Sequence, residues 1–171
     1  MSELDDTVGL RVGIEHSGDG LGLVHTDDTY ETSVEGLWAA LTDAADLARW
    51  VARVDGDLRV AGAFTAAFTS GWEGLGRVDV CDAPHRLVVT LAPDQEDETQ
   101  IEARISARDG GARLVLEERG IPLDEISAHA AGWQVHMEDL AAFIAGTRTS
   151  DWSARWTELV PQYEEHARRY L

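Results

Sequence analysis

Apolar and polar residues alternate through most of the middle of the chain. In residues 98–107, Ile101, Ala103 and Ile105 occupy every second position, with polar residues between them. Successive side chains of a strand point to opposite faces, so this pattern indicates strands with one buried and one wet face. Turn sequences such as DGG at 109–111 favour antiparallel hairpins. The pattern predicts strands at 8–15, 22–31, 62–69, 75–81, 86–92, 98–107 and 112–119.

Helical spacing of apolar residues appears between the second and third predicted strands, over residues 32–50. Ser33 is a favourable N-cap residue, because its hydroxyl can accept a hydrogen bond from an unpaired backbone N–H. Asp43 is placed to cap a second helix that ends near Trp50. The segment is therefore predicted to form two short helices.

A longer helical pattern follows IPL at 121–123 and predicts a helix over about 124–145, which Gly146 ends. The tail at 151–171 keeps helical spacing, but Pro161 predicts a bend or a break into two short helices. The apolar stripe of the long helix consists of Ile126, Trp133, Met137, Leu140 and Ile144.

The order of these elements predicts an α+β fold. A curved antiparallel sheet wrapped around the long C-terminal helix lets the sheet and the helix each bury one apolar face. The two short helices follow the first strands. At 171 residues, we expect a single domain over 1–171, with residues 1–7 frayed and residues 151–171 forming a helical extension.

Composition then excludes several classes of function. The chain has 32 acidic and 14 basic residues and a net charge of −18, so its surface repels nucleic acids and anionic membranes. Every basic residue is an arginine, which excludes chemistry that needs a lysine amine, such as a Schiff base or a P-loop. No stretch has the apolar length of a membrane helix, and the acidic start argues against a secretion signal. Cys81 has no cysteine partner; we expect it to be buried, in a cytoplasmic protein.

Three stretches resemble a known family. They are VEGLWAALTDAADLARW at 34–50, GRVDVCDAPHRLVVT at 76–90 and HAAGWQVHMEDLAAFIAG at 129–146. In this order they resemble the SRPBCC, or START-like helix-grip, superfamily, and within it the branch related to the activator of the ninety-kilodalton heat-shock-protein ATPase. The resemblance spans residues 22–165. It implies a cavity between the long helix and the concave sheet, which in the superfamily holds apolar small molecules.

The long helix supplies most of the candidate site residues. His129, Trp133 and Leu140 fall within a narrow arc of the helix, with His136 at its edge. The two histidines are about 10.5 Å apart along the axis, too far to bind one metal ion. Each would act singly, as a polar contact or as a general acid or base. Family members often carry a histidine where this chain has Gln134, which makes Gln134 a further candidate polar contact. We expect no metal and no cofactor.

Aromatic residues from other segments extend the candidate cavity wall. Phe64 and Phe68 share one strand face, and Trp72 lies between glycines in GWEG, where it could act as a lid. Trp38 and Trp50 flank the two short helices, either at the cavity mouth or pinning the helices to the sheet. Any of these side chains also suits an ordinary core. The candidate ligand-binding residues are Trp133, Met137, Leu140, Phe64, Phe68, Trp38, Trp50, Trp72, His129 and Gln134.

Three functions remain open. The favoured one is non-catalytic binding of an apolar or amphipathic small molecule in the cavity. The second is an enzyme of the polyketide-cyclase or hydratase type that uses His129 or His136 as its acid–base group. The third is a regulatory or co-chaperone-like module whose acidic face attracts a basic protein partner. Homodimerisation through the tryptophan-rich tail at 152–163 also stays open.

Overall fold

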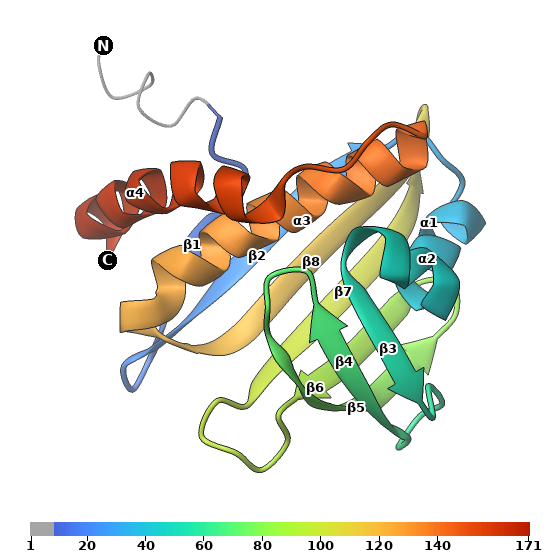
Figure 1. Ribbon diagram of the computed structural model, residues 1–171, viewed down its shortest axis with the longest axis horizontal. Coiled ribbons are helices and arrows are strands. Elements are labelled where there is room, and N and C mark those ends of the chain that lie inside the picture. Colours follow the sequence, from blue (N-terminus) through green and yellow to red (C-terminus); the bar gives the residue numbers. More distant parts are fainter. Residues whose placement is uncertain (1–8) are drawn as a thin grey trace.

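The structure of the chain is a computed structural model that describes residues 9–171 (Figure 1). Its strands are β1 (Gly13–Gly18), β2 (Leu21–Tyr30), β3 (Ala52–Gly56), β4 (Ala63–Phe68), β5 (Glu73–Asp82), β6 (Arg86–Leu91), β7 (Thr99–Arg108) and β8 (Gly111–Pro122). Its helices are α1 (Val34–Thr42), α2 (Ala44–Trp50), the short 3-10 helix η2 (Leu123–Glu125), α3 (Ile126–Ala145) and α4 (Trp152–Tyr170).

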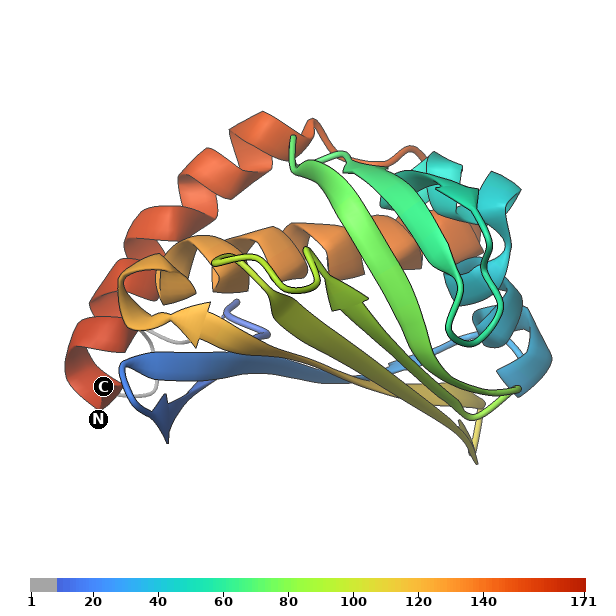
Figure 2. The same cartoon turned by 90° about the horizontal axis from the view of Figure 1, so that it is seen from below.

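Within residues 9–171, eight strands form one antiparallel sheet in the order β1–β2–β8–β7–β6–β5–β4–β3. Strand β2 pairs with the last strand, β8, so β1 and β3 form the two edges. Figure 2 shows the sheet curving around α3, with α4 packed along α3. The predicted α+β helix-grip fold is therefore confirmed.

The two short helices form as their capping residues predict. The hydroxyl of Ser33 accepts a hydrogen bond from the N–H of Gly36 (2.9 Å), and the carboxylate of Asp43 accepts one from the N–H of Asp46 (3.0 Å). The indole N–H of Trp50 donates to the carbonyl oxygen of Ala40 (2.9 Å), and its ring is buried. Trp50 thus pins α2 onto α1.

Strand β7 alternates as predicted, with Ile101, Ala103 and Ile105 buried in the core. The opposite face is drier than the pattern suggests, because the carboxylate of Glu102 is only 5% exposed. Three guanidinium groups cover it, from Arg86, Arg104 and Arg119. Burial alone would raise the pKa of Glu102, but these three hydrogen-bonded arginines outweigh it and lower the pKa to about 2.

Three sequence-based expectations are wrong. Strand β3 was not predicted, because it is a five-residue edge strand with only Ala52 buried, too short for a clear alternation. Helix α4 is a single helix through Pro161, so the predicted alternative of two short helices is wrong. Pro161 and the residue one turn before it, Thr157, are exposed, so water can satisfy the carbonyl that loses its N–H partner. Cys81 is exposed at the end of β5.

Two further expectations concern the ends of the chain and membrane insertion. The predicted fraying of residues 1–7 lies outside the described residues. Within residues 9–171, none of the helices combines the length and the apolar character needed to cross a bilayer.

Candidate functional site

A cavity of about 530 Å³ lies where α3 and the first turns of α4 face the sheet. Helix α4 and the β4–β5 hairpin bring aromatic rings to it, while β7, β8 and α3 bring polar groups. Its aromatic side chains are Phe68, Trp72, Trp133, Trp152 and Trp156. Its ionisable side chains are Asp97, Glu118, Glu125, His129 and His136.

Glu118 is the buried polar centre of this cavity. It follows Leu114 and Leu116 on the inward face of β8, so the alternation of the strand places a carboxylate in a core position. Three donors compensate it: the hydroxyl of Thr99 (3.0 Å), Nδ1 of His129 (2.7 Å) and the indole N–H of Trp133 (3.1 Å). Burial alone would raise the pKa of Glu118, but these three donors outweigh it and lower the pKa.

His129 lies between two carboxylates. Its Nδ1 contacts Glu118, and its Nε2 lies 3.8 Å from a carboxylate oxygen of Glu125. Burial alone would lower the pKa of His129, but the hydrogen bond and charge of Glu118, with a smaller contribution from Glu125, raise it. The side chain is 33% exposed, so the edge of the imidazole remains accessible from the cavity. The site therefore favours an imidazolium–carboxylate pair at its centre.

His136 lies two helical turns beyond His129 on α3, in an apolar setting. Its ring centre is 5.4 Å from that of Trp133, 5.5 Å from that of Trp152 and 6.0 Å from that of Phe68. Burial lowers the pKa of His136 to about 4, so the ring is neutral at pH 7. His136 Nδ1 and Trp152 Nε1 are buried without a hydrogen-bond partner in the described chain. Such atoms mark a wall where a ligand or a water molecule can supply the missing partner.

The aromatic wall is built by pairs of rings. Trp152 and Trp156 stack with their ring centres 6.1 Å apart, and the indole N–H of Trp156 donates to the carbonyl oxygen of Ala128 on α3 (3.0 Å). Across the cavity, Phe68 and Trp72 meet edge to face at 5.6 Å. Helix α4 and the β4–β5 hairpin thus carry most of the rings that face the polar centre.

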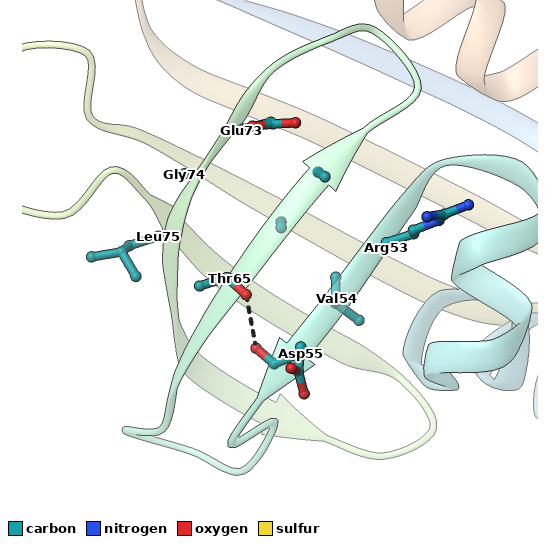
Figure 3. A pocket seen from close by; sticks show the side chains of 9 residues that line it. Arg53, Val54, Asp55, Thr65, Glu73, Gly74 and Leu75 are labelled. Atoms are coloured by element: carbon teal, nitrogen blue, oxygen red, sulfur yellow. Dashed lines mark hydrogen bonds between the residues drawn. The ribbon is translucent and has the colours of Figure 1, made fainter.

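A second hollow, of about 500 Å³, lies over β3, β4 and β5 (Figure 3). The cross-strand neighbours Asp55, Thr65 and Leu75 are all exposed there, and the Thr65 hydroxyl donates to the carbonyl oxygen of Asp55 (3.4 Å). Its lining residues include neither an aromatic ring nor a buried charge. The cavity around Glu118 is therefore the better candidate site.

The sequence model of the family described as "Activator of Hsp90 ATPase homolog 1-like protein" matches residues 31–145, which include Glu118, His129 and Trp133. The chain belongs to this family. The earlier resemblance to the heat-shock-protein ATPase activator branch is thereby confirmed. No curated protein sequence matches the chain.

Solved structures share the fold of this family member. CalU16 from Micromonospora echinospora has a TM-score of 0.73 at 23% sequence identity, covering 91% of this chain and 95% of its own. A protein from Bordetella parapertussis, encoded by gene BPP1335, has a TM-score of 0.71 at 18% identity, covering 88% and 90%. DynU16, a protein in the dynemicin biosynthetic locus, has a TM-score of 0.68 at 21% identity, covering 79% of this chain and 51% of its own.

In this family member, five of the residues singled out from the sequence line the cavity. His129, Trp133 and His136 come from α3, and Phe68 and Trp72 come from the β4–β5 hairpin. The structure thus brings together side chains from two segments that lie 57–68 residues apart in the sequence.

The other candidate residues lie elsewhere, so their assignment to the cavity wall needs correction. Met137 and Leu140 are buried in the core, where the Tyr30 hydroxyl contacts the Met137 sulfur at 3.5 Å. Gln134 is buried on another side of α3, where its side chain donates to the carbonyl oxygen of Gly9 (2.7 Å) and accepts from the Tyr163 hydroxyl. The same is true of Phe64, Trp38 and Trp50, which pack in or against the core and do not line the cavity.

Several cavity residues were missed from the sequence, namely Glu118, Thr99, Asp97, Glu125, Trp152 and Trp156. Glu118 could have been predicted, because it occupies an apolar position of an alternating strand, and a buried glutamate needs hydrogen-bond partners. The sequence suggests the two tail tryptophans only as a possible dimer contact, which stays a prediction; in the structure both side chains line the cavity. Within residues 9–171, no three His, Cys, Asp or Glu side chains are grouped as a metal site would require.

Proposed function

We propose that this protein binds an apolar or amphipathic small molecule in the cavity between α3, α4 and the sheet, without converting it. Membership of the family supports a ligand-binding helix-grip module. The observation that carries the proposal is the set of five aromatic side chains around the buried carboxylate of Glu118 and its half-buried partner His129. The cavity volume of about 530 Å³ lies in the range typical of small-molecule sites.

The aromatic and the polar lining groups contribute to binding in different ways. Removing apolar ligand surface from water contributes about 25 cal/mol per Å², which the aromatic wall can supply. The oxygens of Glu118 already accept from Thr99, His129 and Trp133. The accessible edge of His129 is therefore the group that would orient a polar atom of the ligand.

Native mass spectrometry of gently purified protein is the first test. A bound small molecule, released on denaturation, would identify the chemical class of the ligand. A mass without any adduct would count against a tightly bound passenger and move the balance toward a protein partner.

Paired tryptophan substitutions locate the binding site. Trp156 and Trp38 are both half-buried, but only Trp156 lines the cavity. With the uncharged fluorescent probe N-phenyl-1-naphthylamine, we expect Trp156→Leu to weaken binding about tenfold, the loss of one aromatic contact. Trp38→Leu should leave the affinity unchanged. If Trp133→Ala keeps the affinity within about a factor of two of the parent, the proposed site is wrong.

The hydrogen bond between Glu118 and His129 also favours a second candidate, an acid–base enzyme. A carboxylate on Nδ1 orients an imidazole and raises its basicity, while Nε2 faces Glu125 and the cavity. This function predicts conversion of the released passenger by fresh protein, with a bell-shaped pH dependence that His129→Asn abolishes. Unchanged conversion in His129→Asn and His136→Asn would exclude the mechanism.

A further inference from the structure

The charged groups around the cavity are mostly of one sign. Asp97, Glu118 and Glu125 contribute carboxylates, and His129 is the one side chain there that favours the cationic form. His136 adds no positive charge, because burial keeps it neutral. Within residues 9–171, which include all 14 arginines, no guanidinium group lines the cavity. The cavity therefore carries a net negative charge even when His129 is protonated.

The aromatic wall, like the negative charge of the cavity, favours a cation. The faces of indole and phenyl rings attract cations, and indole does so most strongly. The N–H of Trp133 is bonded to the carboxylate of Glu118, and that of Trp156 to a backbone carbonyl, so these two N–H groups are not available to an anion. The N–H of Trp152 is the exception among these three, because it is buried without a partner in the described chain. Nδ1 of His136, buried and without a partner in the described chain, can accept a hydrogen bond from a ligand N–H.

The two carboxylates at the rim are exposed and well placed to receive a cation. Asp97 lies in the β6–β7 loop and Glu125 in η2, and both side chains line the cavity from the surface. The net charge of −18 on the whole chain adds a long-range attraction for cations and a repulsion of anions.

We infer that the cavity selects ligands that carry a cationic nitrogen, an amine or a quaternary ammonium, on an apolar body, and discriminates against carboxylates and phosphates. This inference rests on the proposed function, since it names the chemical class of the molecule that the cavity binds. The apolar body contacts the tryptophan wall, and the cation lies between the ring faces and the rim carboxylates Asp97 and Glu125.

Three probes that share one naphthylmethyl group test the charge preference by titration calorimetry. They are (1-naphthylmethyl)trimethylammonium, its uncharged carbon isostere 1-neopentylnaphthalene, and the anion 1-naphthaleneacetate. We expect the cation to bind about tenfold more tightly than the isostere, the size of a partly desolvated cation–π contact with a nearby carboxylate. We expect the anion to bind more weakly than both.

Matched charge substitutions separate the cavity from the overall charge of the protein. Asp97→Asn with Glu125→Gln removes two exposed rim carboxylates. The control, Glu96→Gln with Asp124→Asn, removes two exposed carboxylates from neighbouring positions that do not line the cavity. The preference for the cation should fall at least threefold in the rim variant, which equals about half of the tenfold preference on a logarithmic scale, and persist in the control.

The outcomes distinguish the inference from the proposed function. Equal binding of the cation and the isostere, or an equal loss in both double variants, overturns the cationic preference while leaving small-molecule binding intact. Failure of all three probes to bind contradicts the proposed function itself. Tighter binding of the anion reverses the inference, because it would mean that the His129 imidazolium outweighs the carboxylates and the ring faces of the cavity.

Discussion

Substituting His129 tests whether the buried charge of Glu118 depends on it. His129→Phe keeps a planar ring of similar size but removes both the donor and the positive charge. The carboxylate of Glu118, 5% exposed, then retains only the neutral donors Thr99 and Trp133. We expect a large loss of stability from this single change, because a buried carboxylate without its cation is strongly unfavourable.

The magnitude follows from the burial of the two partners. Removing one member of a buried ion pair costs about 3–5 kcal/mol. His129 is 33% exposed and Glu118 keeps two donors, so we expect the lower end, about 3 kcal/mol. For a chain of this length that corresponds to a fall in Tm of about 6–12 °C. Glu118→Gln, which keeps an acceptor for Trp133, should cost about 1–2 kcal/mol.

Urea denaturation of the parent, the two single variants and the double variant forms a double-mutant cycle. The double variant should be more stable than the sum of the single effects by about 2 kcal/mol, because removing the carboxylate relieves the cost of removing its cation. His129→Gln, which restores a neutral donor, should recover part of the loss. Additivity within about 0.5 kcal/mol would refute the reasoning, since uncoupled residues behave that way.

The stability difference between the parent and His129→Phe should also depend on pH. The pKa of His129 is raised above its ordinary 6.5, so its stabilisation is fully present below pH 6.5 and is lost as the pH rises through the raised value. The pKa of Glu118 is lowered below its ordinary 4.5, so its stabilisation is present above pH 4.5 and is lost as the pH falls through the lowered value. The stability difference between the parent and His129→Phe should therefore be largest between pH 4.5 and 6.5. A difference that grows toward pH 9 would contradict the assignment.

Three other substitutions test the structure around the site. Arginines hold the pKa of Glu102 at about 2, below its ordinary 4.5, so its stabilisation is present above pH 4.5 and is lost as the pH falls toward 2. In urea titrations, Glu102→Gln should therefore lose less stability over that pH range than the parent. An identical loss would contradict the role of the arginine cluster. Gly76→Ala should cost about 2 kcal/mol in thermal unfolding, because the added Cβ would overlap the ring of Phe64; a variant as stable as the parent would mean that the ring can move aside. Tyr163→Phe leaves the N–H of Val12 without its acceptor and should cost about 1–3 kcal/mol, with faster hydrogen exchange in residues 9–12; unchanged exchange there would show that other contacts hold this segment.

The fold could be predicted because its main signals are local. Alternation over β7, the caps Ser33 and Asp43, and the glycine that ends α3 each involve residues close in sequence. The predictions fail where the local sequence pattern does not determine the surroundings of a residue in the fold. Pro161 is tolerated inside α4 because that face of the helix is exposed to solvent.

The cavity could be predicted only in part, because α3 is buried on nearly all sides. Trp133 and His129 face the cavity, Met137 faces the core, and Gln134 faces the N-terminal segment and Tyr163. A helical wheel separates a buried face from an exposed one, but it cannot tell three buried surroundings apart. The partner of His129 was equally hidden, since Glu118 reaches it only through the packing of β8 on α3.

Part of the aromatic wall of the site lies outside the residues that match the family model. The family match ends at residue 145, whereas Trp152 and Trp156 come from α4. Three contacts fix α4 against α3. The carboxylate of Asp139 accepts hydrogen bonds from the backbone N–H and the hydroxyl of Ser150, just before α4. Within α4, Arg155 pairs with Glu138 and the Tyr163 hydroxyl donates to Gln134. Because these contacts hold two of the five aromatic rings in place, α4 determines the shape of one wall of the cavity. The family match covers β3 to β8, α3 and the Glu118–His129 pair, and we expect the choice of ligand to depend on the additional wall that α4 supplies.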